Sequence, residues 1–127
     1  KAVIEDCGYT SLNEEIEYEA QYLYHLPASP RFPLVQMLSG INRIENGFFF
    51  SQCSSIQALH HNHLPTLFIH GGADHFVPTQ MVYQNYRASR GPKELWVVPK
   101  ASHAKSFQTQ PRAYKRHIKA FLDEYVK

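Results

Sequence analysis

The chain has 127 residues, which is typical of one domain, and its 43% hydrophobic and 19% charged residues indicate a globular protein. A formal net charge of +2 gives little support to a nucleic-acid-binding or membrane-surface function. The two cysteines, Cys7 and Cys53, are too few for a disulfide scaffold and lack metal-site spacing, so we interpret them as reduced core thiols. No apolar run reaches the roughly 18 residues that a membrane span requires, and we expect no membrane contact from this segment.

Three short apolar segments that end in turn residues are predicted to be strands, at residues 2–4, 66–70 and 94–98. The last two contain continuous apolar runs, at residues 67–69 and 95–98, instead of alternating apolar and polar residues. This is typical of parallel strands that helices cover on both faces. The first segment begins directly after Lys1, without a starting Met or a signal-peptide pattern, so we expect further sequence upstream. The default expectation for localisation is the cytoplasm, and any signal or anchor would lie before Lys1.

A helical pattern follows each predicted strand, at residues 11–24, 79–88 and 111–126. Ser11 is the expected N-cap of the first helix, and Thr109 is a possible cap for the last. The alternation of strand and helix predicts an α/β protein with a parallel sheet flanked by helices in three layers, joined by right-handed crossovers.

The segment between the first two predicted strands does not fit this alternation. Several prolines divide it, and we expect short helices at residues 35–41 and 54–59. About 40 residues is long for a simple crossover. We therefore predict an excursion over the carboxyl ends of the strands that covers a pocket.

Two residues with catalytic potential follow neighbouring predicted strands. Asp74 lies in the loop after the second strand, and His103 lies in the loop after the third. Active sites in open parallel sheets lie beyond the carboxyl ends of strands, and adjacent strands are about 4.8 Å apart. The loops can therefore bring the carboxylate and the imidazole into contact. Such a carboxylate fixes the tautomer of the ring and leaves its other nitrogen to accept a proton from a Ser or Cys nucleophile.

The stretch His70-Gly-Gly-Ala-Asp74-His-Phe-Val-Pro78, followed by His103, resembles the acid and histidine segments of the α/β-hydrolase family. The chain order in that family is nucleophile, acid, histidine. The resemblance implies a serine hydrolase of the esterase or peptidase type, which transfers the acyl group of a small ester, thioester or amide to water. It implies that Asp74 orients His103 and that His103 acts as general base and then general acid. It implies no metal and no organic cofactor.

The resemblance covers essentially the whole chain but only the C-terminal half of the family's fold. Residues 2–8 resemble the strand after the nucleophile helix, and residues 111–127 resemble the closing helix. Residues 11–63, roughly, resemble a helical cap insertion. We therefore expect residues 1–127 to form a single, partial α/β-hydrolase domain.

Two features depart from the family pattern. Residues 100–102 are Lys-Ala-Ser, where the family commonly has glycines before the histidine. No serine stands in a G-x-S-x-G motif, and Ser89 comes nearest, with Gly91 after it but Arg87 before it. Cys7 also lacks the two glycines. The nucleophile and the oxyanion-hole amides would therefore lie upstream, and we expect this chain alone to be inactive.

Several other residues have alternative interpretations. Asp74 is also a common turn former or helix N-cap, and His103 could be a surface histidine. Asp6 ends the first strand and is an alternative acid, because some members of the family place the acid there. His70 is expected to help shape its loop, with a direct catalytic role as the alternative, and His75 is expected to be exposed.

Two residue clusters are given a structural interpretation. The run His60-His61-Asn62-His63 suggests zinc, but adjacent histidines point in different directions, so we favour a polar loop. A metal-binding protein that uses this run is the weakest of the hypotheses. Phe48–Phe50 could line an acyl pocket, but we favour core or the underside of the cap. Tyr18, Tyr22 and Tyr24 are candidate cap residues facing a substrate.

A sheet of three strands is small, and the outer edge of its first strand has consequences for partners. If the resemblance holds, this edge normally pairs with the strand that bears the nucleophile, and it is bare in this chain. We therefore predict self-association, or pairing with an upstream half that is supplied separately. The competing hypothesis is a non-catalytic binding or oligomerisation module on the same scaffold.

Overall fold

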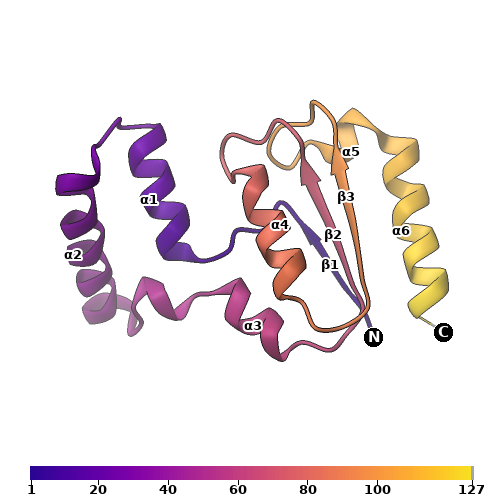
Figure 1. Cartoon of the computed structure of the whole chain (residues 1–127), viewed down its shortest axis with the longest axis horizontal. Helices are drawn as coiled ribbons and strands as arrows, with labels where there is room; N and C mark the ends of the chain where they lie inside the picture. Colours follow the sequence, from indigo (N-terminus) through magenta and orange to yellow (C-terminus); the bar gives the residue numbers. More distant parts are fainter. Residues whose placement is uncertain (127) are drawn as a thin grey trace. The chain divides into compact units, whose positions relative to one another are not determined.

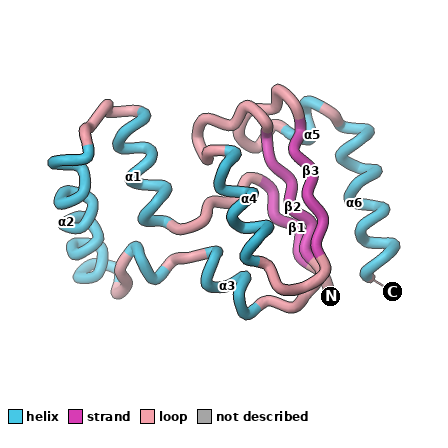
Figure 2. The backbone as a smooth tube through the Cα atoms, viewed as in Figure 1, coloured by secondary structure: helices cyan, strands magenta, loops and turns pink. Residues whose placement is uncertain are grey.

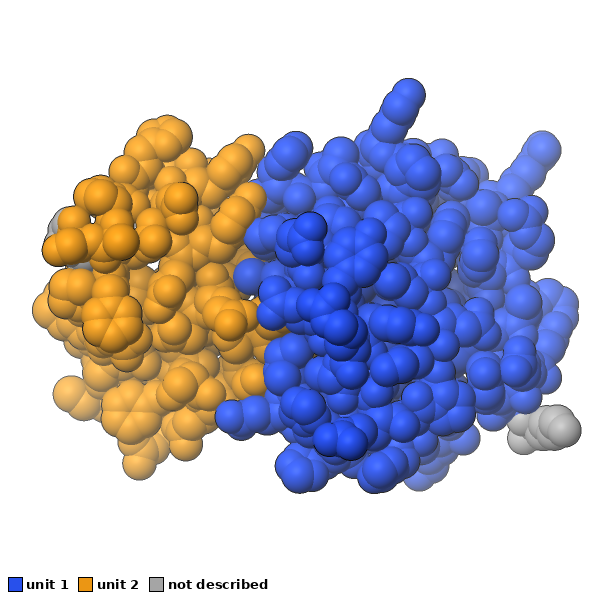
Figure 3. All heavy atoms as spheres, in the orientation of Figure 1, with its two compact units in different colours: residues 1–9, 56–127 blue, residues 10–55 orange. Residues whose placement is uncertain are grey.

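The computed structural model describes residues 1–126 and, at Pro30, the backbone alone. The chain forms two compact units (Figure 3). Residues 1–9 and residues 56 onward make up the first, and residues 10–55 make up the second. No helix among the described residues combines the length and the apolar character of a membrane span.

The first unit is built on a parallel sheet. Its strands are β1 (Val3–Asp6), β2 (Thr66–Gly71) and β3 (Lys93–Val98), in the order β1-β2-β3. All three predicted strands are confirmed, as is their parallel arrangement with helices on both sides (Figure 1).

The central strand is the most deeply buried part of the sheet. Register aligns Val3 with Thr66 and Thr66 with Lys93. Every residue of β2 is buried, as its continuous apolarity predicts. In β3 only Val98 is fully buried. The prediction of burial on both faces therefore holds for β2 and only in part for β3, because β3 is an edge strand of this sheet.

One face of the sheet is covered by two helices that connect the strands. These are α3 (Ser55–His61) and α4 (Thr79–Ala88), and α4 has the predicted bounds. Phe68 of β2 packs against them in a buried cluster that includes Leu59 and Val82. Full burial of one such side chain contributes about 1.5–3 kcal/mol to stability.

The other face of the sheet is covered by α6 (Pro111–Tyr125). Leu67 and Ile69 of β2 are fully buried there with Phe121 of the helix. Successive side chains of a strand point to opposite faces, so these residues lie opposite Phe68. The apolar spacing of β2 and α6 thus places one half of the core on each side of the sheet.

A short helix, α5 (Ser106–Thr109), directly precedes α6. The prediction of Thr109 as the N-cap of α6 is wrong, because Thr109 is the last residue of α5. Gln110 occupies the N-cap position and Pro111 the first turn. Proline is well suited there, since its missing N–H would have no helical acceptor.

The second unit contains α1 (Leu12–Tyr22), α2 (Ala28–Asn46) and the short 3-10 helix η1 (Phe50–Gln52). The N-cap predicted for α1 is confirmed. Ser11 has an extended backbone, and its hydroxyl accepts a hydrogen bond from the backbone N–H of Glu14 at 3.2 Å. This bond satisfies one of the N–H groups that a helix start leaves unpaired.

The helix α2 is much longer than the prediction of residues 35–41. Its backbone leaves the helical region at Ser29, because a residue that precedes proline disfavours the α conformation. Pro33 lies in the first turn after this kink, where it disturbs few helical hydrogen bonds. The helix ends at Gly47, whose φ of 87° is readily adopted by glycine. The prolines therefore mark a helix start instead of breaking the segment.

The compact unit of residues 10–55 is shorter than the excursion predicted for residues 11–63. The helix predicted at residues 54–59 is found as α3. It belongs to the first unit because Ile56 and Leu59 pack in the core beside β2. A role of the second unit as a cap stays a prediction.

The aromatic residues of the second unit are only partly buried. Phe49 is exposed, whereas Phe48 and Phe50 are half-buried, so this run is not a closed core. The rings of Tyr18 and Tyr22 stack with centroids 5.6 Å apart.

Candidate active site

Asp74 and His103 meet at the carboxyl edge of the sheet. Their loops follow β2 and β3, which end at the same edge (Figure 2). The Nδ1 atom of His103 lies 2.9 Å from Oδ2 of Asp74. The Asp74 side chain is fully buried, whereas that of His103 is 36% exposed. The predicted contact is therefore confirmed, and the catalytic role of the pair stays a prediction.

The Asp74 carboxylate is held by its own loop as well as by His103. Its Oδ1 atom accepts hydrogen bonds from the backbone N–H groups of Phe76, at 3.0 Å, and Val77, at 2.9 Å. Hydrogen bonds to an ionised carboxylate are stronger than those between neutral groups. Asp74 therefore forms the local turn that its residue type favours and still directs its second oxygen at His103.

The two loops are bonded to each other at close range. The backbone N–H of Ala73 donates to the carbonyl of Ala101 at 2.9 Å, and that of Gly72 donates to Val98 at 2.8 Å. A Cβ atom at Gly71 would lie 2.4 Å from the carbonyl oxygen of Ala101. Glycine is therefore required at position 71, because any side chain would push the loops apart.

The loop that carries His103 reaches its shape without glycine. Lys100 and Ala104 have positive φ angles of 63° and 53°, in the region that favours glycine. Each such residue costs of order 1 kcal/mol, and strain of this kind is concentrated at functional sites. The departure from the family pattern at residues 100–102 is thus accommodated, because a lysine adopts a left-handed backbone conformation.

The imidazole of His103 packs against an aromatic ring. The ring centroids of Phe76 and His103 are 4.9 Å apart, and Phe76 is 53% exposed. With Nδ1 on the buried carboxylate, the Nε2 atom on the far side of the imidazole points away from Asp74. Sequence reasoning missed Phe76, since a single aromatic residue in a loop carries no periodic signal.

Cys7 supports the same site from the end of β1. Its Sγ atom accepts a hydrogen bond from the backbone N–H of Ala104 at 3.4 Å and lies 3.3 Å from Oδ1 of Asp6. Burial, the largest cause, raises the pKa of the thiol to about 12. A thiol in that state is a poor nucleophile, which agrees with the sequence argument against Cys7 in that role.

Cys7, His70 and Asp74 bring a sulfur, a nitrogen and an oxygen within 4.8 Å of one another. Zinc binds such ligand sets. Here the oxygens of Asp74 already accept hydrogen bonds from His103 and from backbone groups, and zinc would require the Cys7 thiolate. We therefore interpret the cluster as hydrogen-bonded support for the Asp74–His103 pair.

Asp6, the alternative acid, has different partners. Its Oδ2 atom accepts a hydrogen bond from the hydroxyl of Tyr114 on α6 at 2.8 Å. Burial, together with this bond, raises the pKa of Tyr114 to about 12. The structure therefore pairs His103 with Asp74, and it pairs Asp6 with the tyrosine.

The remaining histidines singled out from the sequence lie in different surroundings. His70 is fully buried at the carboxyl end of β2, and its Nε2 atom lies 3.0 Å from the carbonyl oxygen of Val77. This agrees with the expectation that His70 shapes its loop. His75 is exposed, as expected, and so are His61 and His63 near the end of α3.

Comparison with known proteins begins with sequence. No protein-family model matches the chain. An uncharacterized protein of Bacillus subtilis, YqkD, is 27% identical over 120 residues, which is 94% of this chain and 38% of that protein. The chain thus spans less than half the length of this curated relative.

Solved structures share the fold at low sequence identity. The esterase Pf2001 of Pyrococcus furiosus has a TM-score of 0.64 and 19% identity, covering 98% of this chain and 44% of that one. The acylaminoacyl peptidase of Pyrococcus horikoshii has a TM-score of 0.64 and 17% identity, and the match covers 100% of this chain and 20% of the peptidase. MGS-MChE2, an α/β hydrolase from a sediment metagenome, has a TM-score of 0.54 and 16% identity, and the match covers 97% of this chain and 62% of MGS-MChE2.

These likenesses concern the fold and not the activity, because all of the identities to solved structures are low. The matched structures are longer than this chain, which agrees with a resemblance to part of a larger domain. The chain has an α/β fold of three parallel strands flanked by helices, and it shares this fold with the solved structures named above.

Proposed function

We propose that this chain is the C-terminal part of a serine hydrolase of the α/β-hydrolase type. The reaction is acyl transfer to water from a small ester, thioester or amide. The observation that carries the proposal is the hydrogen bond between the buried Asp74 carboxylate and His103 at the carboxyl edge of a parallel sheet. The shared fold of an esterase and a peptidase supports the same reaction class.

We propose a separate task for each residue. Oδ2 of Asp74 accepts the Nδ1–H of His103, which leaves Nε2 unprotonated as the general base. Nε2 takes the hydroxyl proton of a serine as its oxygen attacks the acyl carbon, and then gives that proton to the leaving group. Water repeats the two steps and releases the acid. Asp74 stabilises the imidazolium that forms between them.

The nucleophile and the oxyanion hole come from sequence outside residues 1–127. No serine of the chain stands in a G-x-S-x-G motif, and the matched esterase is more than twice as long as the segment it shares with this chain. The chain alone should therefore show no turnover, since the nucleophile and the main electrostatic contribution are both missing.

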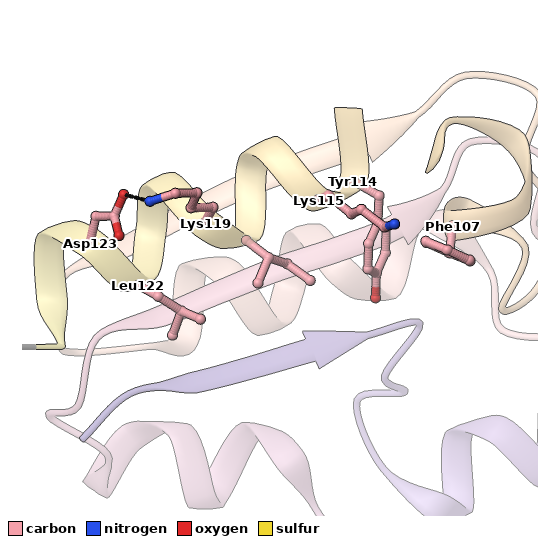
Figure 4. A pocket seen from close by; sticks show the side chains of 7 residues that line it. Phe107, Tyr114, Lys115, Lys119, Leu122 and Asp123 are labelled. Atoms are coloured by element: carbon pink, nitrogen blue, oxygen red, sulfur yellow. Dashed lines mark hydrogen bonds and ion pairs between the residues drawn. The ribbon is translucent and has the colours of Figure 1, made fainter. Parts of the chain in front are cut away.

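The open edge of β1 leads us to propose the upstream half of the same hydrolase as the partner. Within residues 1–126, β1 pairs only with β2. A groove of about 360 Å³ lies along α6 (Figure 4). Its lining combines apolar side chains, which include Phe107, Ile118 and Leu122, with the charged side chains of Lys115, Lys119 and Asp123. An edge strand and a groove with apolar side chains in one unit fit a strand and helix supplied by a longer chain. A second copy of this chain is the alternative occupant.

The test uses a longer gene product that contains this chain and an upstream G-x-S-x-G motif. We expect a fluorophosphonate probe to label the serine, and Asp74→Asn or His103→Ala to abolish the labelling. His75→Gln is the matched control, because His75 is an exposed histidine of the loop that carries Asp74. The serine should be labelled normally in this variant. Labelling that survives both site substitutions would refute the assignments and favour the non-catalytic module.

A further inference from the structure

We propose that His70 is a positioning residue that fixes the orientation of the Asp74 carboxylate toward His103. The inference rests on the proposed function, because it gives the Asp74–His103 pair a third member. Its test is chosen so that this inference can fail while the pair itself is intact.

His70 lies on β2, just before the loop that carries Asp74, and its ring contacts Val77 near the end of that loop. Its side chain is fully buried. Its Nε2 atom lies 3.0 Å from the carbonyl oxygen of Val77 and 3.4 Å from Oδ2 of Asp74. A carbonyl oxygen can only accept, so Nε2 carries a hydrogen. Val77 accepts that hydrogen, and Oδ2 of Asp74 lies close to the same nitrogen.

His70 lies near the same oxygen of Asp74 that accepts the hydrogen bond from His103. Oδ2 of Asp74 accepts from His103 on one side and lies close to the Nε2–H of His70 on the other. Oδ1 is held by the backbone N–H groups of Phe76 and Val77. A carboxylate with donors at both oxygens has one favoured orientation about its Cβ–Cγ bond. His70 supplies the side-chain donor that keeps Oδ2 in the plane where His103 meets it.

The other ring nitrogen of His70 specifies the tautomer. Nδ1 is buried and has no hydrogen-bond partner among the described residues. A hydrogen on Nδ1 would therefore be buried without an acceptor, which is costly. With the hydrogen on Nε2, the ring donates to the carbonyl oxygen of Val77 and presents an N–H group to Oδ2 of Asp74. A histidine is thus held in one form at a position where leucine would fill the space without donating.

The first experiment measures the tautomer of His70 in the unmodified chain. Long-range ¹H–¹⁵N correlation of the histidine rings distinguishes a protonated Nε2 from a protonated Nδ1. We expect His70 to carry its hydrogen on Nε2 alone. A hydrogen on Nδ1 with Nε2 bare would overturn the proposal, because the contact with Val77 could not then exist as described.

The second experiment follows a spectroscopic signature of the pair. The Nδ1–H of His103 should give a strongly downfield proton signal in the unmodified chain. His70→Leu should shift or abolish this signal while the amide fingerprint of the sheet persists. His70→Gln keeps an N–H donor of similar reach and should restore it. His75→Gln, the matched control, should leave it unchanged. A purely structural role would not separate the leucine variant from the glutamine variant.

The outcomes distinguish this inference from the proposed function. If the unmodified chain gives no downfield signal, or if Asp74→Asn does not remove it, the pair itself fails. If the signal depends on Asp74 but is unchanged in a folded His70→Leu variant, the inference about His70 fails alone. Should the leucine variant not fold, loss of the signal in folded His70→Gln overturns the inference. If neither variant folds, the inference is judged by the tautomer of His70 in the unmodified chain, where a hydrogen on Nε2 supports it and a hydrogen on Nδ1 overturns it.

The longer product gives a functional measure of the same effect. Misplacement of a catalytic group by about 1 Å can cost about a hundredfold in rate. We expect His70→Leu to slow fluorophosphonate labelling by about tenfold or more, and His70→Gln to recover most of the rate. Equal labelling rates in all three proteins would contradict a positioning role.

Discussion

The thiol of Cys7 and the backbone N–H of Ala104 are hydrogen-bonded, with Sγ 3.4 Å from the nitrogen. Cys7 follows β1, and Ala104 directly follows His103, so the bond joins the first strand to the loop of the candidate base. Both residues have positive φ angles, 59° for Cys7 and 53° for Ala104. The bond therefore joins two residues with strained backbones, one of them next to His103 in the chain, and each helps to hold the other in place.

Cys7 should resist alkylation while the chain is folded. The thiolate is the reactive form of cysteine, and burial raises the pKa of Cys7 to about 12. At mildly alkaline pH we expect iodoacetamide to modify the half-buried Cys53 first and to reach Cys7 only when urea unfolds the chain. Peptide mass mapping at increasing urea measures both sites. Modification of Cys7 at the rate of Cys53 without urea would contradict the burial of the thiol.

Glu5 should destabilise the fold as pH rises. Burial raises its pKa above the ordinary 4.5, and the smaller effect of the hydrogen bond from Asn85 lowers it. A group that binds its proton more tightly in the folded state stabilises the fold fully below pH 4.5. That contribution is lost as pH rises through the folded-state pKa. Glu5→Gln keeps an oxygen for Asn85 and removes the charge, so it should raise the free energy of unfolding at neutral pH.

Urea unfolding at neutral pH and at a pH below 4.5 measures this effect. The stabilising effect of Glu5→Gln, relative to the unmodified chain, should shrink at the lower pH. Glu45→Gln on an exposed part of α2 is the control and should change stability little at either pH. The prediction would be wrong if the two substitutions behaved alike.

Asp74 should contribute more to stability than His103. Asp74→Ala leaves the backbone N–H groups of Phe76 and Val77 without their acceptor, at a cost of about 2 kcal/mol or more. His103→Ala removes a side chain that is 36% exposed and should cost less. Asp74→Asn retains one oxygen acceptor and should fall between the two. Urea unfolding of the three variants tests this order, and a larger loss for His103→Ala would refute it.

The open edge of β1 should make the isolated chain associate. Ile4 on this strand is 38% exposed, and an exposed edge strand is a template for pairing with another chain. Analytical ultracentrifugation should show association that increases with concentration and is weakened by Ile4→Lys, since a lysine on an edge opposes pairing. Val126→Lys, another exposed apolar position, is the control and should have little effect. A monomer at high concentration would contradict the prediction.

Local patterns determined most of the elements of the first unit. The continuous apolarity of β2, the proline before α4 and the helical spacing of α6 are short-range signals, and each element lies within a few residues of its prediction. The contact of Asp74 with His103 could also be predicted, because residues that follow adjacent parallel strands emerge at one edge of the sheet. Chain order and strand adjacency were sufficient for that inference.

Other features of the site depend on contacts between distant parts of the chain. The ring of Phe76 against His103, the bond from Ala104 to Cys7 and the left-handed backbone of Lys100 have no local pattern that predicts them. The extent of α2 was also missed, because a proline can break a helix or lie in its first turn, depending on where the helix starts.

The amino-acid sequence by itself determined the strands, the helices of the sheet and the order of acid and histidine, because these follow from periodicity and from residues a few positions apart. Only the tertiary structure decided which oxygen of Asp74 meets His103, what surrounds that oxygen, and that Asp6 bonds Tyr114 instead. Orientation at a buried site results from packing and hydrogen bonds among segments far apart in the chain, and these exist only once the sheet has formed.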